Sequence, residues 1–217
     1  MKSDDFDQLE SLLYSAVIAD ILDEFGQKKS VLDYRIRPLS PEMVVMGRAF
    51  TILATDVYAE PEEPYKLELE AVDNIQPGDV VVATTNGSTA SGFWGELLST
   101  AAKGHGCRGV VLDGLTRDAT KIIEMEFPVF GRGFIPYDSK GRTDVIAYQV
   151  PICSGDALIN PGDIVFADYD GAVVIPRKIA AQVIAKAREK IAGENKVKQE
   201  LLSGMSAREV FEKYHIL

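Results

Sequence analysis

The sequence predicts a mixed α/β domain that ends in a helical segment. Short runs of apolar and β-branched residues, typical of strands, are interspersed with stretches whose apolar residues recur at helical spacing. The 217 residues can bury a sizeable core, and no linker rich in Pro, Gly or Ser divides them. A TIM barrel is not expected, because regular strand–helix alternation is absent. We expect an α/β domain over residues 1–176 and a helical extension over residues 177–217.

The N-terminal part begins with a predicted helix over residues 15–26. Its apolar residues share one face, with Ser15 as the candidate N-cap and Gly26 as the residue that ends the helix. Residues 43–54 are rich in strand formers. An acidic segment broken by prolines follows, and it is expected to enter a helix over residues 66–74.

Two similar turns each lead into an apolar strand. Segments 76–83 and 160–167 share Pro-Gly-Asp, and Pro-Gly fits the centre of a type II turn, where glycine takes a positive φ. Nothing else recurs at this offset, so two similar strand entries are expected and not a repeat. Another strand is predicted over residues 128–133, and Asp170-Gly171 between two apolar runs predicts a hairpin.

The remaining elements are helical or short. Residues 87–106 run from a glycine-rich loop into a helix, a buried strand follows over 109–112, and a helix begins near residue 119. A long helix is predicted from about residue 177 to residue 202. A last short helix is expected to begin at Ser206, which opens a capping box.

Charge and cysteine content limit the class of protein. A net charge of −10 gives no basic face for a nucleic acid and no basic helix for an anionic membrane surface. Cys107 and Cys153 form no disulfide framework, which favours free thiols in a reducing compartment. The acidic N-terminus has no signal-peptide pattern, and no apolar run is long enough to span a membrane. We therefore expect a cytoplasmic protein with neither nucleic acid nor membrane as partner.

Several familiar kinds of site are absent from the sequence. His105 and His215 have no metal-ligand spacing, and the chain has no CxxC motif, so a zinc site is not expected. It also lacks a GxSxG elbow and a Walker loop, and no GxGxxG run opens a helix after a strand. Cys107 has no identifiable histidine partner and fits a small buried residue better than a nucleophile. The remaining candidates for a functional site are carboxylate side chains, which can bind a metal ion, and arginine, which can bind an anion.

The loop that ends at residue 95 leads into a helix whose first N–H groups have no partner within the helix. Such donors, at the positive end of the helix dipole, suit a carboxylate or a phosphate. The alternative is that Gly92 and Gly95 only turn the chain.

Arg117 and Asp118 stand side by side where a strand passes into a helix. The guanidinium of arginine matches a carboxylate in a bidentate manner, and aspartate offers the hard oxygen that Mg²⁺ or Mn²⁺ prefers. Adjacent residues at a helix start point about 100° apart, so the pair could hold a small ligand's carboxylate and a metal ion that the ligand chelates. The alternative is an ordinary acidic residue at a helix start, beside a surface arginine.

Together these stretches resemble the RraA-like family, which contains class II pyruvate aldolases and the regulator of ribonuclease E activity. The resemblance lies in residues 92–122, 127–133 and 160–176, and residues 19–26 and 44–52 fit the N-terminal half of the family. Its most specific part combines Gly-Glu-Leu-Leu, Arg-Gly-Val-Val-Leu-Asp-Gly and Arg-Asp. The resemblance covers nearly the whole chain and implies a swivelling β/β/α fold.

The resemblance also implies roles for four catalytic residues. Asp118 would be the single protein ligand to a divalent metal ion, Mg²⁺ or Mn²⁺, and Arg117 would bind the pyruvyl part of the substrate. Glu96 would order water at the metal. Glu194 would act from the C-terminal helix of a neighbouring subunit.

A substrate-binding loop is implied beside these residues. It comprises Gly95, Glu96, Leu97 and Leu98, and the N–H groups of Leu97 and Leu98 would bind the substrate carboxylate together with Arg117. The acidic segment over residues 56–70 does not align with the family. Whether it shapes the pocket over the distal end of the substrate is left open, and so is the preferred 2-oxo acid.

The activity implied is a metal-dependent aldolase that cleaves a 4-hydroxy-2-oxo acid, of the 4-hydroxy-4-methyl-2-oxoglutarate type, to pyruvate. Oxaloacetate decarboxylation is expected too, because it leaves the same enolate. The family implies trimers or paired trimers with sites between subunits. A Schiff-base aldolase would need a desolvated lysine, and the candidates, Lys103 and Lys121, lie in helix patterns that indicate exposure.

The alternative function is a non-catalytic regulator that binds ribonuclease E. The regulators are shorter and lack the C-terminal helix with the additional glutamate, so the helix of this chain favours the aldolase. That helix could also serve only to pack subunits together.

Overall fold

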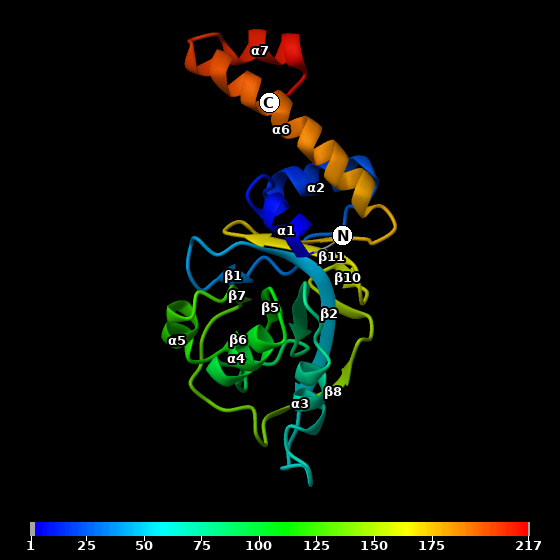
Figure 1. The fold of residues 1–217 in the computed structure, drawn as a ribbon, viewed down its shortest axis with the longest axis vertical. Helices are drawn as coiled ribbons and strands as arrows, with labels where there is room; N and C mark the ends of the chain where they lie inside the picture. Colours follow the sequence, from blue (N-terminus) through cyan, green and yellow to red (C-terminus); the bar gives the residue numbers. More distant parts are fainter. Residues whose placement is uncertain (1–2, 217) are drawn as a thin grey trace.

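A curved mixed sheet of eight strands forms the centre of the fold (Figure 1). The structure is a computed structural model, and it describes residues 3–216. In spatial order the strands are β1 (Arg37–Pro38), β7 (Val129–Gly131), β5 (Gly109–Asp113), β3 (Asp79–Thr84), β2 (Val45–Asp56), β11 (Ile164–Asp168) and β12 (Gly171–Ile175), and β8 (Thr143–Tyr148) also pairs with β2. The predicted mixed α/β fold class is confirmed.

Strand β2 gives the sheet its curvature. It pairs in parallel with β3, whereas β11 and β8 pair in antiparallel fashion with its first and last residues. The register shifts between Leu53 and Ala54, within the pairing of β2 with β8. The sheet therefore closes almost into a barrel.

Helices cover the sheet on opposite sides (Figure 1). They are α1 (Ser3–Glu10), α2 (Ser15–Glu24), α3 (Lys66–Asp73), α4 (Glu96–Gly104), α5 (Ala119–Glu124), α6 (Ala180–Leu202) and α7 (Ala207–Tyr214). Two small sheets accompany them, one formed by β4 (Gly92–Trp94) with β6 (Leu115–Thr116) and one by β9 (Ile152–Ser154) with β10 (Ala157–Ile159). None of the helices described combines the length and the apolar character that crossing a membrane requires.

The central parallel strands are buried on both faces, which explains their continuous apolar sequences. In β3, Val81 and Ala83 pack with α3 and α4, whereas Val80 and Val82 pack with residues of β11 and β12. A third apolar cluster joins α1, α2 and the first half of α6 to β11 and β12. The side covered by α3 and α4 is the one that carries the candidate site.

Most local predictions hold. Gly78 and Gly162 adopt φ values of +88° and +81° in the two Pro-Gly-Asp turns, as a type II turn requires. Gly26, at +73°, ends α2 as predicted. The predicted N-cap of α2 is wrong. Tyr14 occupies that position, and Ser15 is instead buried, where its Oγ donates a hydrogen bond of 2.7 Å to Asp168.

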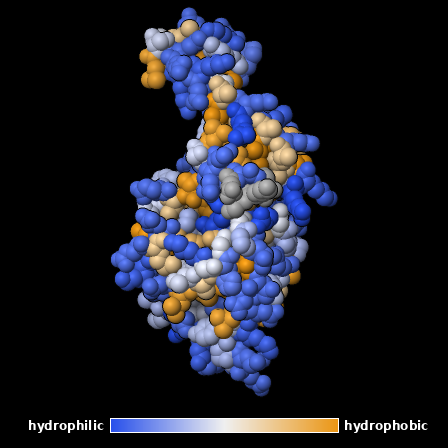
Figure 2. All heavy atoms as spheres, viewed as in Figure 1, coloured by the Kyte–Doolittle hydropathy of each residue, from blue (hydrophilic) through white to orange (hydrophobic). Residues whose placement is uncertain are grey.

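The C-terminal helices are present as predicted, including the capping box at Ser206. The first half of α6 packs on α2 through buried residues such as Val183 and Ala187, and the second half projects from the body with α7 (Figure 1). Figure 2 shows apolar side chains gathered where α6 leaves the body. The division of the chain after residue 176 stays a prediction.

Candidate active site

The small sheet of β4 and β6 brings two distant segments together. The strands run parallel, and the N–H of Arg117 donates a hydrogen bond of 2.9 Å to the Trp94 carbonyl. Thr116 Oγ1 donates a second one, of 2.5 Å, to the same oxygen. Because the chain leaves both strands at the same end, Gly95 lies directly beside Arg117.

Gly92 and Gly95 are required for close approach. A Cβ atom on Gly95 would lie 2.7 Å from Asp118 Oδ2, and one on Gly92 would lie 2.8 Å from Arg117 Cβ. Gly95 has an extended backbone, with φ −142° and ψ −169°, and Gly92 has no positive φ. These glycines therefore make room for the Arg-Asp pair, and the interpretation that they only turn the chain is wrong.

Asp118 adopts a left-handed conformation, with φ 58° and ψ 28°, at the start of α5. For a residue other than glycine such a conformation costs about 1–3 kcal/mol. Five other non-glycine residues among those described also have a positive φ, so the direction of the Asp118 carboxylate is the more telling feature. Its side chain does not cap α5. Oδ2 instead lies 3.2 Å from the Glu96 nitrogen, whose N–H donates to it, and 3.5 Å from Arg117 Nε. Oδ1 has no hydrogen-bond or ion-pair partner among residues 3–216. Asp118 is therefore not an ordinary acid that caps its own helix.

The N-terminus of α4 presents free donors next to this carboxylate. No side chain caps the helix. The N–H groups of Leu97 and Leu98, unlike that of Glu96, have no acceptor within the described part of the chain. The positive end of the α4 dipole therefore faces the same space as Arg117 and Asp118.

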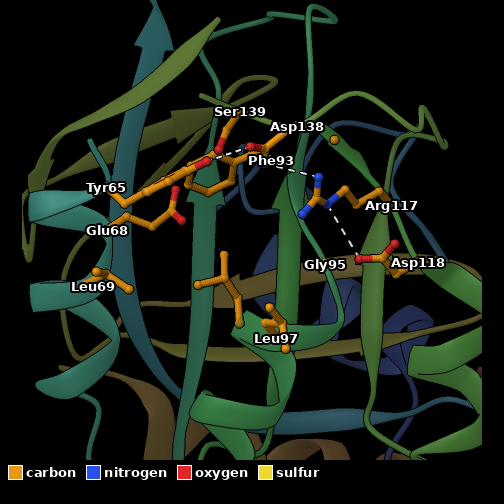
Figure 3. A pocket seen from close by; sticks show the side chains of 12 residues that line it. Tyr65, Glu68, Leu69, Phe93, Gly95, Leu97, Arg117, Asp118, Asp138 and Ser139 are labelled. Carbon is orange, nitrogen blue, oxygen red and sulfur yellow. Dashed lines mark hydrogen bonds and ion pairs between the residues drawn. The ribbon is translucent and has the colours of Figure 1, made fainter. Parts of the chain in front are cut away.

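These elements enclose a pocket of about 250 Å³ between α3, α4 and the end of β6 (Figure 3). Five residues predicted from the sequence line it, namely Gly95, Leu97, Leu98, Arg117 and Asp118. The remaining lining residues are Tyr65, Glu68, Leu69, Gly92, Phe93, Asp138 and Ser139.

Arg117 is held by two carboxylates. In addition to Asp118, it contacts Asp138, with 3.1 Å between Nη1 and Oδ1. The Tyr65 hydroxyl donates a hydrogen bond of 2.5 Å to the other oxygen of Asp138. The pKa of the Asp138 carboxyl lies below its usual value. Burial alone would raise this pKa, but the hydrogen bond from the Tyr65 hydroxyl and the charge of Arg117 together outweigh burial. The Nη2 atom of Arg117 has no acceptor among the described residues.

Glu68 is the most buried acid of the pocket. Burial, followed by the charges of Asp138 and Asp144, raises the pKa of its carboxyl to about 7, although Arg117 acts in the opposite direction. Burial and the hydrogen bond to Asp138 likewise raise the pKa of Tyr65 to about 12.

Two of the predicted catalytic glutamates do not line this pocket. The N–H of Glu96 binds Asp118, but its side chain is not among the lining residues. Glu194 lies in α6, where it accepts a hydrogen bond from the Tyr14 hydroxyl. Figure 1 shows α6 on the opposite side of the sheet from α3 and α4. The predicted roles of the two glutamates stay predictions.

Reasoning from the sequence missed Tyr65, Glu68, Asp138 and Ser139 as pocket residues. A usable indication existed for Glu68, which shares the buried face of α3 with Ala71 and Val72. An acidic residue at a core position of a helix is a functional candidate. No such sequence pattern identifies Asp138 as a candidate pocket residue, because it lies outside any helix or strand.

The donor set fits one type of metal ion. No group of three or more His, Cys, Asp or Glu side chains is arranged to hold a metal among residues 3–216. A single carboxylate with a free oxygen, facing a pocket, suits Mg²⁺ or Mn²⁺, because such ions keep most of their water and also bind substrate oxygens.

Comparisons with known proteins agree with this picture. The sequence profile of the RraA-like family, described as "Aldolase/RraA", matches residues 15–174. A Halalkalibacterium halodurans protein named "Putative 4-hydroxy-4-methyl-2-oxoglutarate aldolase" is 32% identical over 177 residues, which cover 82% of this chain and 79% of that protein. The protein DlpA of Legionella pneumophila is 32% identical over 203 residues. The match covers 92% of this chain but only 32% of DlpA, so the chain spans about a third of that relative's length.

A solved structure is similar over most of the chain. It is Streptomyces coelicolor RraAS2, described as an unusual member of the RNase ES inhibitor RraA protein family. The TM-score is 0.79 at 31% sequence identity, and the match covers 90% of this chain and 96% of RraAS2.

Proposed function

This chain belongs to the RraA-like family, and we propose that it is a divalent-metal-dependent aldolase that cleaves a 4-hydroxy-2-oxo acid and releases pyruvate. One observation supports this proposal most strongly. Asp118, in a strained conformation, directs its carboxylate away from its own helix and into a pocket that also contains Arg117 and the free N–H groups of α4.

The pocket offers complementary groups for the pyruvyl half of such a substrate. The carboxylate would bind the N–H groups of Leu97 and Leu98 and the free Nη2 of Arg117. Asp118 would hold the metal ion through its free Oδ1. The ion, when bound, supplies Lewis-acid stabilisation of the negative charge that develops on the 2-oxo oxygen.

Cleavage breaks the bond between C3 and C4, and the proton of the 4-hydroxyl group must leave. Arg117 stabilises the charge that accumulates on the pyruvyl fragment, because its guanidinium is cationic and can donate several hydrogen bonds. We assign to Glu96 and to Glu194 of the partner subunit the ordering of the water that accepts the hydroxyl proton. Decarboxylation of oxaloacetate leaves the same fragment and is expected at the same site.

The assignment of Glu194 requires an assembly with sites between subunits, and we propose a trimer or a pair of trimers. The projecting part of α6 with α7 leaves apolar side chains in solvent, including Leu202, which is 87% exposed, and Phe211, which is 49% exposed. A neighbouring copy would cover such side chains and bring Glu194 to the pocket.

A second candidate is a regulator that binds a ribonuclease, and the similarity to RraAS2 favours it. Binding through the surface does not require a strained aspartate in a polar pocket. The pocket therefore favours the enzyme over the regulator.

The proposed function is tested with protein freed of metal by a chelator. Pyruvate release from 4-hydroxy-4-methyl-2-oxoglutarate, 4-hydroxy-2-oxoglutarate, 4,5-dihydroxy-2-oxopentanoate and oxaloacetate is followed through a coupled assay, with and without Mg²⁺ or Mn²⁺. We expect metal-dependent release from at least one of them. No release from any of them, under either metal, would contradict the proposal.

A further inference from the structure

Glu68 is a buried carboxyl group that the protein itself leaves without a partner. The residue is only 5% exposed, and its carboxylate makes no hydrogen bond or ion pair with residues 3–216. Its oxygens are not among the fully buried, unpartnered side-chain atoms of those residues, so the carboxylate opens onto the pocket. Figure 3 shows its carboxyl group directed from α3 into the pocket. Burying an acid in this way is unfavourable, as the raised pKa of Glu68 reflects. A ligand group that donates a hydrogen bond would compensate for that cost.

Glu68 lies on the side of the pocket opposite to Asp118 (Figure 3). Leu69 of α3 and Tyr65, the residue before that helix, accompany it there, whereas Arg117 and Asp118 form the other side. A 2-oxo acid whose pyruvyl half binds Asp118 and Arg117 would therefore extend its distal end, beyond C4, toward Glu68.

The charges on the pocket wall limit what that distal end can be. The lining residues include three acids, Glu68, Asp118 and Asp138, and Arg117 is the single lysine or arginine among them. Arg117 already contacts two carboxylates and would bind the substrate's first carboxylate as well. A second carboxylate at the distal end would meet an ionised Glu68, and the lining that this chain supplies offers no further lysine or arginine to pair with it. A hydroxyl group would instead donate a hydrogen bond to Glu68.

We propose that the substrate is a 4-hydroxy-2-oxo acid whose distal end carries a hydroxyl group in place of a second carboxylate, and that Glu68 selects it. This inference rests on the proposed aldolase function. Cleavage breaks the bond between C3 and C4, the 4-hydroxyl loses its proton to give an aldehyde, and C3 gains a proton to become the methyl group of pyruvate. The second product is therefore a hydroxyaldehyde.

A matched pair of substrates tests the proposal. 4,5-Dihydroxy-2-oxopentanoate and 4-hydroxy-2-oxoglutarate differ only in that C5 is a CH₂OH group in the first and a carboxylate in the second. At about pH 8, where Glu68 is ionised, we expect kcat/KM to be higher for the dihydroxy acid by about tenfold or more. Glu68→Gln should reduce this ratio, mainly by raising kcat/KM for the dicarboxylate. Glu70→Gln is the control, because Glu70 lies in the same helix but outside the pocket, where it accepts a hydrogen bond from Tyr148.

Binding gives a readout that does not depend on turnover. 5-Hydroxy-2-oxopentanoate and 2-oxoglutarate lack the 4-hydroxyl group and cannot undergo the cleavage, and calorimetry with Mg²⁺ should show tighter binding of the hydroxy acid. If pyruvate is released but both kcat/KM and the binding affinity are higher for the dicarboxylate, this inference is overturned and the proposed function stands. An unchanged ratio in Glu68→Gln would overturn the role of Glu68. No pyruvate from either substrate would overturn this inference, and no pyruvate from any of the four substrates named for the proposed function would overturn that function as well.

Discussion

Asp118 Oδ2 accepts a hydrogen bond of 3.2 Å from the N–H of Glu96, the first residue of α4, although Asp118 itself stands at the start of α5. Helix α5 therefore begins at Asp118, whereas the N-terminus of α4, the positive end of that helix dipole, holds the Asp118 carboxylate in place. The contact connects two segments 22 residues apart in the chain. It depends on Gly95, over which the carboxylate lies.

Gly95→Ala should reduce activity more than stability. The new Cβ atom would lie 2.7 Å from Asp118 Oδ2, so the carboxylate must move by several tenths of an ångström. We expect kcat/KM to fall by about tenfold or more, with a change in unfolding free energy of about 1 kcal/mol or less. Gly104→Ala, at the other end of α4, is the control, because a Cβ there has no atom within 4 Å. Equal kinetics for the two variants would contradict this account of Gly95.

Arg117→Lys should lower kcat/KM by about tenfold or more, a loss of about 1.4 kcal/mol. Lysine retains the charge but cannot contact Asp118, Asp138 and a substrate carboxylate together through one planar group. Steady-state pyruvate release measures the effect, with Arg208→Lys on exposed α7 as the control. Unchanged kinetics would remove Arg117 from the substrate site.

Glu68→Gln should change how stability depends on pH. The carboxyl has a pKa of about 7 in the folded protein and an ordinary value of 4.5 when unfolded, so the folded state binds more protons between these values. The contribution of Glu68 to the stability of the wild-type protein should therefore fall by up to about 3 kcal/mol as pH rises from about 4.5 to about 7. The variant should lack this loss. Denaturant unfolding of both proteins across that range tests the prediction, and a pH-independent difference would contradict it.

Glu194→Ala and Asp118→Asn should complement each other when both chains are expressed in one cell. If each site combines Asp118 of one subunit with Glu194 of another, random mixing leaves about a quarter of the sites intact. Each variant alone should be strongly impaired, whereas the mixture should recover roughly that fraction of activity. A mixture no more active than the average of the two variants would place both residues in the same subunit's site or remove Glu194 from it.

Elements with local determinants were predictable from the sequence. The capping box at Ser206 and the two Pro-Gly-Asp turns depend on residues within one turn of chain. The hairpin was predictable too, but Asp168 pairs with Gly171, so its loop is residues 169–170 and not Asp170-Gly171. The N-cap of α2 was not predictable, because Ser15 finds a partner 153 residues away, in Asp168.

Strand β8 and the β9–β10 pair were missed because they are mixed in polarity or only three residues long. They form because distant residues pair with them, and β8 depends on the last part of β2. The same reason limits prediction of the site. Arg117 and Asp118 were identifiable as a local pair, whereas Asp138 becomes a pocket residue only because the fold brings its loop to Tyr65, 73 residues away.

The central claim is that the Asp118 carboxylate holds a divalent cation for pyruvate release. The most direct test compares wild-type protein with Asp118→Asn in a Mg²⁺ titration of chelator-treated samples, using the best substrate of the wild type. Asparagine has nearly the same shape and can still accept the Glu96 hydrogen bond. We predict saturable, Mg²⁺-dependent pyruvate release by the wild type and none by the variant at any Mg²⁺ concentration. Equal Mg²⁺ dependence in the two proteins would contradict the claim.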